Sequence, residues 1–337
     1  MNEVVKNTPV GSTLAGQTAA RTIFNNFISK YGSFVVVQAE NPDGDSLGAA
    51  LALESVLMEK ETSLYCPVQI PKHLRYLAGW DRVSDEYNFS AQAVIIVDTA
   101  SEVLLSKLLE TPEIKNHLVS HPVLVVDHHV TEADLTFDHE LIQGDEVSTT
   151  RVLQKLLPEV TPDVAQMLLA GTMSDTLGLT TPAVGAEDYR AVADLIDAGA
   201  NVADLEEARR ELAKKTPRML DYKADLIKRV EYHLDGKLAT VHIGWEEIRE
   251  YSDEYNPGVL ILEELRMVEG VEVAVAVKTY PDGKLTGKIR ALKPIAEELA
   301  GHFGGGGHAY AAGFRVYENY EQVLRELVGA ADELLED

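Results

Sequence analysis

The sequence predicts an α/β protein of two domains, and three observations lead to this expectation. Its 337 residues exceed the length of one typical domain. Short apolar, β-branched runs at 34–37, 93–97 and 123–126 alternate with helical patterns, which is typical of buried parallel strands. A charge-rich helical stretch at 188–225 then separates these strands from a region with hairpin patterns.

The composition limits the class of protein. A content of 45% hydrophobic and 25% charged residues is ordinary for a soluble globular chain. The net charge of −25 argues against a general nucleic-acid binder, which needs a basic surface to neutralise phosphates. A small anionic substrate is still compatible with this charge, because bound metals and one or two arginines reverse the field locally. Solubility explains most of the surface acidity equally well.

Cysteine usage and the N-terminal region bear on the compartment. Cys66 is the only cysteine, so neither an intrachain disulfide nor a cysteine-based zinc site can form. Residues 1–30 lack the apolar core of a signal peptide, and no run of about 18 apolar residues occurs. We therefore expect a cytoplasmic protein without a membrane partner.

The first acidic turn follows the first predicted strand. Residues 14–30 have the apolar spacing of an amphipathic helix, 34–37 form the strand, and 49–58 form a helix of small and apolar residues. The turn before this second helix, Asn-Pro-Asp43-Gly-Asp45, places two carboxylates one residue apart, where both can point at one cation cluster. The alternative is a turn that uses its aspartates for local hydrogen bonds.

Acidic residues recur where later apolar segments end. Strands are predicted at 63–68, 93–97 and 123–126, and an apolar helix at 164–170. The last three segments are followed in turn by Asp98, by Asp127, His128 and His129, and by Asp175. Each aspartate has the alternative role of capping a following helix. Because the carboxyl ends of parallel strands share one sheet edge, the recurrence predicts a carboxylate and histidine pocket for two divalent metals, suited to phosphoryl displacement.

The region after residue 225 predicts a smaller domain. It contains a strand pair around Asp235-Gly236, helices near 246–251 and 260–268, and a hairpin of 271–279 with 285–291. Four consecutive glycines, Gly304–Gly307, follow, and we expect a helical run of small residues after them. Successive glycine amides can approach and bind an anion, whereas the alternative is a flexible linker. Arg290 could bind phosphate with two hydrogen bonds, or form a structural salt bridge.

Assembled in this order, the motifs resemble those of the DHH phosphoesterase superfamily over nearly the whole chain. The four motifs of its catalytic domain are similar to Asn-Pro-Asp43-Gly-Asp45-Ser-Leu-Gly, Val-Asp98-Thr, Asp127-His128-His129 and Gly-Thr-Met-Ser-Asp175-Thr. The segment Gly-Gly-Gly-Gly-His308-x-x-Ala-Ala-Gly is similar to the signature of the DHH-associated domain. The chain looks closest to the nanoRNase and 3′-phosphoadenosine-5′-phosphate (pAp) phosphatase branch.

The resemblance implies a fold and a cofactor. It implies a catalytic DHH domain at 1–200, with a roughly five-stranded parallel sheet and helices on both faces. A helical linker at 201–225 and a mixed-sheet, substrate-binding DHH-associated domain at 226–337 would follow. The implied cofactor is a two-metal centre that prefers Mn²⁺, with Mg²⁺ as the alternative.

The resemblance also implies residue roles. Asp98 would bridge two ions, with Asp45, His128 and Asp175 completing one site and Asp43 belonging to the other. Asp127, His128 and His129 would form the catalytic group, in which Asp127 and His129 support the ligands and contact phosphate. The terminal nucleotide would be bound by Arg290, Gly305, Gly306, Gly307 and His308.

One position departs from the family pattern. The family usually has a histidine four residues before Asp43, where this chain has Ala39. Gln38 is adjacent, but in a regular strand it points to the opposite face. One metal site is therefore expected to lack a ligand, unless a local bulge brings Gln38 to it.

The leading interpretation is a Mn²⁺-dependent phosphodiesterase and phosphatase. It would hydrolyse short oligoribonucleotides, pAp to AMP, or both, so the expected partner is short RNA or a 3′,5′-bisphosphorylated nucleotide. The oligomeric state stays open, and a homodimer is compatible with the resemblance. Two alternatives remain: a non-catalytic nucleotide sensor whose metal site is impaired at Ala39, and an inorganic pyrophosphatase-like hydrolase.

Overall fold

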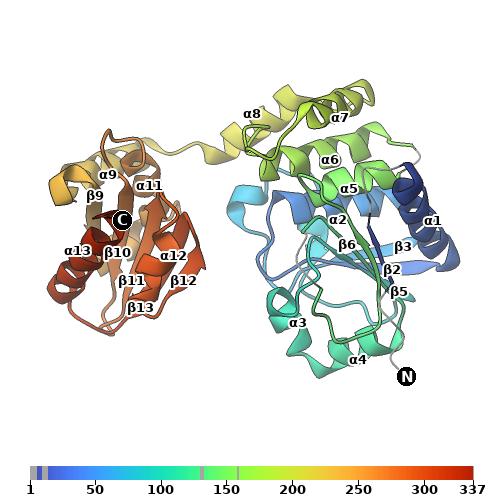
Figure 1. Ribbon diagram of the computed structural model, residues 1–337, viewed down its shortest axis with the longest axis horizontal. Helices are drawn as coiled ribbons and strands as arrows, with labels where there is room; N and C mark the ends of the chain where they lie inside the picture. The colour runs from blue at the N-terminus through green and yellow to red at the C-terminus, as the bar shows by residue number, and fades with distance from the viewer. Residues whose placement is uncertain (1–5, 10–13, 130–132, 158, 337) are drawn as a thin grey trace. The chain divides into compact units, whose positions relative to one another are not determined.

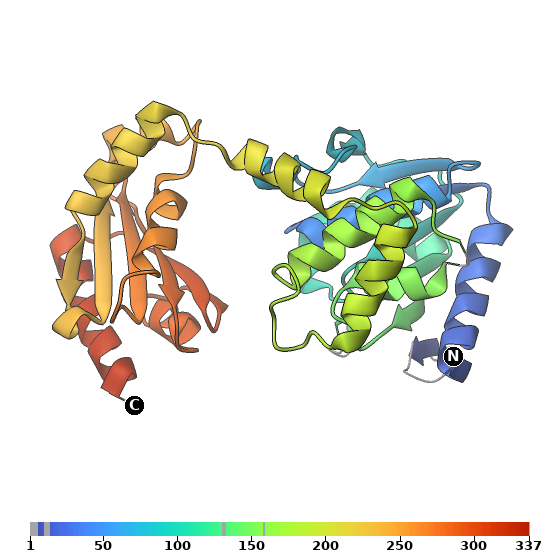
Figure 2. The ribbon, with the colours of Figure 1, turned by 90° about the horizontal axis from the view of Figure 1, so that it is seen from above.

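The computed structural model describes residues 6–9, 14–129, 133–157 and 159–336. The chain divides by its internal contacts into two units, Met1–Lys214 and Lys215–Asp337. Each unit has a sheet and a buried core of its own (Figures 1 and 2). The segment 201–225, where a linker is expected, contains helix α8 (Val202–Ala213) of the first unit and most of α9 (Pro217–Lys228) of the second.

The first unit contains a seven-stranded sheet in the order β1-β7-β6-β5-β2-β3-β4, and every pairing in it is parallel. Its strands are β1 (Lys6–Pro9), β2 (Ser33–Val37), β3 (Glu61–Tyr65), β4 (Val83–Ser84), β5 (Ala93–Val97), β6 (Val123–Asp127) and β7 (Glu140–Gln143). The sheet is wider than the roughly five strands expected. The additional strands β1, β4 and β7 are only two to four residues long and lack an extended apolar run, so periodicity does not reveal them.

Helices cover both faces of this sheet, as predicted. One face carries α1 (Leu14–Lys30), α2 (Gly44–Val56), α5 (Thr149–Leu156) and α6 (Pro162–Asp175), and the other carries α3 (Ser106–Leu109) and α4 (Pro112–Ser120) (Figure 1). Helix α7 (Ala186–Asp197) packs on α6, and three short 3₁₀ helices are η1 (Lys72–Leu74), η2 (Trp80–Arg82) and η3 (Val103–Leu105). Within β5, Ile95 faces the α2 side and Ile96 the α3 side. Strands buried on both faces must be apolar throughout, which explains the uninterrupted runs in β2, β5 and β6.

The second unit contains a six-stranded mixed sheet in the order β12-β13-β11-β10-β9-β8. Only β9 with β10 pairs in parallel among these strands. The strands are β8 (Glu231–His233), β9 (Leu238–Ile243), β10 (Val273–Thr279), β11 (Leu285–Ala291), β12 (Gly306–His308) and β13 (Ala311–Val316). A parallel-sheet unit followed by a mixed-sheet unit confirms the predicted fold class.

Helices also pack on both faces of this second sheet. Helices α9 and α11 (Pro257–Leu265) cover one face, while α12 (Ala296–Gly301) and α13 (Tyr320–Glu336) cover the other. The remaining helices are α10 (Trp245–Tyr251) and the 3₁₀ helix η4 (Leu234–Gly236). The prediction of a helix after the glycine run is wrong. The residues that follow the run form strand β13, which pairs with both β11 and β12. None of the described helices has the length and apolar character needed to cross a membrane.

Candidate metal centre

The turn after β2 works as a helix cap. Asp43 is the N-cap of α2, and its Oδ1 accepts hydrogen bonds from the backbone N–H groups of Asp45 (3.0 Å) and Ser46 (2.9 Å). The helix therefore begins at Gly44, five residues earlier than the apolar pattern predicts. The cap leaves Asp43 exposed and turns Asp45 inward, where it is fully buried. Local hydrogen bonding and presentation of a carboxylate thus coexist in one turn.

The N-terminus of α5 holds the buried Asp45 carboxylate. Its Oδ2 accepts the N–H of Thr149 (2.5 Å), and its Oδ1 accepts both the N–H (3.0 Å) and the hydroxyl (2.6 Å) of Thr150. Burial raises the pKa of Asp45, and the hydrogen bond from Thr150 opposes this shift. The Thr149 hydroxyl donates to Asp98 Oδ1 (2.8 Å). Sequence reasoning missed both threonines, although Ser148-Thr149-Thr150 at a helix start is an N-cap signal.

Asp98 follows β5 in a strained backbone conformation. Its φ of 66° lies in the left-handed region, which non-glycine residues rarely occupy, although Asp and Asn tolerate it best. The side chain is 8% exposed. Burial raises the pKa of Asp98 well above its ordinary value, and the charges of Asp45, Asp43 and Asp175 add to this shift. Several carboxylates therefore approach one another here, and their mutual repulsion adds to the cost of ionising Asp98.

His128 faces these carboxylates with its Nε2 atom. Its Nδ1 donates to the backbone carbonyl of Glu146 (3.0 Å), so the neutral ring carries its lone pair on Nε2. Nε2 lies 3.3 Å from Asp175 Oδ2 and 3.6 Å from Asp98 Oδ1. It is buried and has no hydrogen-bond partner among the described residues. A buried lone pair aimed between two carboxylates fits a divalent metal ion.

Two groups of side chains could hold such an ion. The first contains Asp45, His128 and Asp175, the second contains Asp98, His128 and His129, and the ligand atoms of each group lie within 4.8 Å of one another. His129 Nδ1 is already engaged, because it donates to Asp127 Oδ1 at 2.7 Å. The first group, with Asp98 beside it, is therefore the better-formed site. Asp43 belongs to neither group.

Asp127 supports His129 rather than facing the other carboxylates. The Asp127 side chain is 1% exposed, and its Oδ1 also accepts the N–H of His129 (3.1 Å). This pairing raises the pKa of His129, since the imidazolium form gains the hydrogen bond to a carboxylate. The His129 side chain is 48% exposed, so it can reach a bound anion.

The metal-free centre should make stability depend on pH. Burial, followed by the charges of Asp45 and Asp43, raises the pKa of Asp175 from 3.8 to about 8. Between these values the folded protein binds more protons at this carboxyl than the unfolded chain, so the free energy of unfolding falls as pH rises. Urea unfolding with a chelator should show this fall between about pH 4 and about pH 8.

Asp175→Asn is the matched control for this pH dependence, because its side chain cannot ionise. Its unfolding free energy should fall less steeply than that of the wild type over the same range. Adding a divalent metal to the wild-type protein should raise its unfolding free energy most at the upper end of this pH range, where the carboxylates are ionised. Equal slopes for the wild type and the variant would contradict the assignment.

Ala39, the position expected to lack a metal ligand, and its neighbour Gln38 are both buried. Ala39 is 6% exposed and offers no coordinating atom. Gln38 is fully buried, and neither of its amide atoms has a hydrogen-bond partner among the described residues. The Gln38 N–H donates to the Tyr65 carbonyl at 3.0 Å, which continues the ladder between β2 and β3. The backbone at Gln38 is therefore still paired as a strand.

The residues expected to bind substrate lie in the second unit. Arg290 is partly buried on β11, its Nη1 donates to the carbonyl of Ile289 (2.9 Å), and it forms no ion pair within the described part of the chain. Gly305 and Gly307 pack closely on β13, where a Cβ would come within 2.7 Å of Phe314 Cα and 2.6 Å of Ala312 Cα, respectively. Gly306 has open space around it. The side chain of His308 lies outside the described structure.

Comparisons with known proteins agree with these motifs. The family model of the DHH family N-terminal domain matches residues 33–172, and that of the DHHA1 domain matches residues 247–337. A bifunctional oligoribonuclease and PAP phosphatase NrnA from Thermus thermophilus is 25% identical over 305 residues, covering 87% of this chain and 88% of the relative. The protein of the same name from Bacillus subtilis is 20% identical over 311 residues, covering 89% and 95%. An exopolyphosphatase-related protein from Bacteroides fragilis shares the fold, with a TM-score of 0.79 at 19% identity over 95% of this chain and 98% of that one.

Proposed function

The chain is a two-domain DHH-family phosphoesterase, and from this premise we propose that it hydrolyses short oligoribonucleotides and pAp. The observation that carries the proposal is the buried His128 Nε2, which faces Asp98 and Asp175 without a hydrogen-bond partner in the described structure. The choice of substrate is supported by the two NrnA relatives, whose names combine both activities and which match most of this chain.

In this proposal the chain's own residues prepare the centre for metal and phosphate. Asp45, His128, Asp175 and Asp98 would hold divalent ions, preferably Mn²⁺. Bound ions would supply Lewis acidity toward the phosphoryl oxygens. The Glu146 carbonyl selects the His128 tautomer, and the α5 threonines hold the carboxylates in place. His129, whose pKa is raised by its hydrogen bond to Asp127, would donate a hydrogen bond to a phosphate oxygen.

The second unit would contribute substrate contacts. Arg290 is the best-supported residue, because its guanidinium is partly buried without a carboxylate partner in the described structure. An arginine in this state can bind a phosphate with two hydrogen bonds. The open space at Gly306 and the His308 position would serve the terminal nucleotide.

A turnover assay tests the proposed function. Purified full-length protein with Mn²⁺ or Mg²⁺ is incubated with pAp, a diribonucleotide, a pentaribonucleotide and pyrophosphate. We expect release of phosphate from pAp and of mononucleotides from the oligonucleotides. Turnover of pyrophosphate alone would replace the proposal with a pyrophosphatase.

The second candidate is a nucleotide sensor, and the observation that favours it is Ala39. Without a ligand there, one ion would depend on Asp43, Asp98, water and substrate. Binding of nucleotides without turnover of any substrate, at saturating metal, would establish the sensor.

Metal titration should expose the missing ligand. We expect Mn²⁺ to bind the free protein at one tighter and one much looser site, because Ala39 coordinates nothing. Ala39→His should tighten the looser site if the ring fits, and Ala39→Leu is the control that fills the space without a ligand. Isothermal titration calorimetry of the free protein gives both affinities. Two equally tight sites in the wild type would show that another group, such as Gln38, has replaced the histidine.

A further inference from the structure

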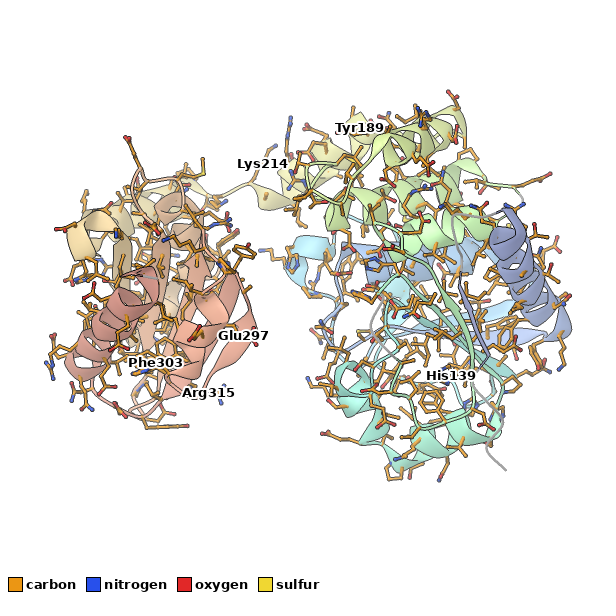
Figure 3. All side chains as sticks on the ribbon, viewed as in Figure 1. His139, Tyr189, Lys214, Glu297, Phe303 and Arg315 are labelled. Atoms are coloured by element: carbon orange, nitrogen blue, oxygen red, sulfur yellow. The ribbon has the colours of Figure 1, made fainter. Side chains whose placement is uncertain are left out.

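A basic cavity lies in the second unit. Its volume is about 540 Å³, which is within the range of small-ligand sites. Lys278, Lys288 and Arg315 line it together with Asn256 and Thr286, and no aspartate or glutamate does so in the described structure. Figure 3 labels Arg315, which extends from β13. Three cations without an acidic neighbour are notable in a chain with a net charge of −25.

Strand register places the three cations on one sheet face. Lys278 of β10 pairs with Thr286 of β11, which pairs with Arg315 of β13. Lys288 is two residues along β11, so its side chain is on the same side, about 6.7 Å further along the strand. Its neighbours across the strands, Ala276 and Gly313, are small and leave room above the sheet.

Lys278 is a buried cation without an anionic partner. It is 8% exposed, and its Nζ donates to Asn256 Oδ1 at 2.8 Å. Burial lowers its pKa to about 8, and the charge of Lys288 contributes. No ion pair of the described residues includes Lys278, Lys288 or Arg315. Because an ammonium offers three donors and its burial without an anion is costly, this site is prepared for an anion.

Asn256 links the Lys278 ammonium to the N-terminus of helix α11. Asn256 is the N-cap of α11, and its Oδ1 also accepts the N–H of Gly258 (3.1 Å). The Lys278 ammonium therefore contacts the N-cap residue of α11. The partial positive charge of a helix N-terminus adds to the potential of the three cations.

We propose that this cavity is a subsite for a second phosphate group of the substrate, held by Lys278 and Lys288 with Arg315 at its edge. The inference rests on the proposed function and extends it, because Arg290 lies two residues beyond Lys288 on the same sheet face. A nucleotide with phosphodiesters at successive positions could contact both Arg290 and the Lys278 site. Oligonucleotides of several phosphates should therefore bind more tightly than a dinucleotide.

Direct binding tests the subsite independently of turnover. Fluorescence anisotropy of the full-length protein in a chelating buffer measures the affinity for a labelled pentaribonucleotide and a labelled diribonucleotide. Lys278→Met and Lys288→Met should each weaken pentanucleotide binding about tenfold or more, which is the effect of losing a charged hydrogen bond. Each should also lower the slope of log affinity against log salt by about 0.7. The affinity for the diribonucleotide should fall less than the affinity for the pentaribonucleotide.

The control is Lys237→Met, which removes one charge from an exposed position of the same unit. It should leave both the affinity and the salt slope unchanged. Thermal unfolding separates binding from folding, because Lys278→Met removes an uncompensated buried charge and should not lower Tm. If Lys278→Met lowers Tm and Lys288→Met binds the pentaribonucleotide normally, the role of Lys278 is to hold Asn256 in the fold. That result would overturn the subsite.

Two further outcomes separate the subsite from the proposed function. Normal pentanucleotide affinity in both lysine variants would overturn the subsite even if the enzyme is active. If the lysine variants bind the pentaribonucleotide more weakly but the wild type turns over no substrate, the subsite is supported and the proposed hydrolytic function is refuted. Competition with inorganic phosphate distinguishes the source of the anion: displacement of pentanucleotide and dinucleotide at the same phosphate concentration would indicate a site for free phosphate and overturn the oligonucleotide assignment.

Discussion

Asp98→Asn should reduce turnover to background, even at saturating Mn²⁺. Asp98 Oδ1 lies 3.6 Å from His128 Nε2, and the charges of Asp45 and Asp175 act on this carboxylate, so its negative charge would be central to holding ions there. Asparagine is among the residues that best tolerate the φ of 66° at this position. Its side-chain oxygen can still accept the Thr149 hydroxyl. The substitution therefore removes charge while it keeps the local geometry.

The measurements are steady-state turnover, metal content and urea unfolding. Asp81→Asn is the matched control, because Asp81 is exposed on η2 away from these ligands. In chelating buffer at about pH 8, Asp98→Asn should unfold at higher urea than the wild type, since one of several repelling carboxylates is gone. Retention of most of the wild-type turnover would refute the role of Asp98 in a metal centre.

Gly171→Ala should impair both metal binding and stability. Helices α2 and α6 pack closely through glycines, and a Cβ on Gly171 would lie 2.7 Å from both Asp45 Oδ1 and Thr150 Oγ1. The methyl group must displace the hydrogen bonds that hold Asp45. Overpacking of this kind typically costs about 1–3 kcal/mol of unfolding free energy. Because Asp45 moves, affinity for the first metal should fall at least tenfold.

Gly329→Ala provides the control for Gly171→Ala. Gly329 lies within α13, and a Cβ there would have nothing within 4 Å. Replacing an exposed helical glycine by alanine should raise the unfolding free energy by about 0.5–1 kcal/mol. Urea unfolding and Mn²⁺ calorimetry of both variants check the pair. Unchanged metal affinity in Gly171→Ala would show that Asp45 does not need its α5 hydrogen bonds.

Much of the fold and part of the site follow from local sequence. The continuous apolar runs of β2, β5 and β6 predict strands buried on both faces, and such strands are parallel. Their carboxyl ends meet at one edge, so Asp98 and His128 could be placed together from sequence. The short strands β1, β4 and β7 could not be predicted, because a strand of two to four residues has no readable period. The sequence predicts a helix for the residues of β13, and this prediction is wrong, because small residues suit either structure and pairing with β11 and β12 decides.

What the sequence by itself determined is which residues bear charge or lone pairs and at which strand end or turn they occur, because hydrophobic periodicity and turn chemistry are local. Only the tertiary structure decided their pairing. Asp45 receives its hydrogen bonds from Thr149 and Thr150, more than a hundred residues later. The His128 tautomer depends on the Glu146 carbonyl, and the Lys278 cavity depends on the register of β10, β11 and β13. These contacts are set by helix packing and strand register, which depend on the whole core and leave no local pattern in the chain.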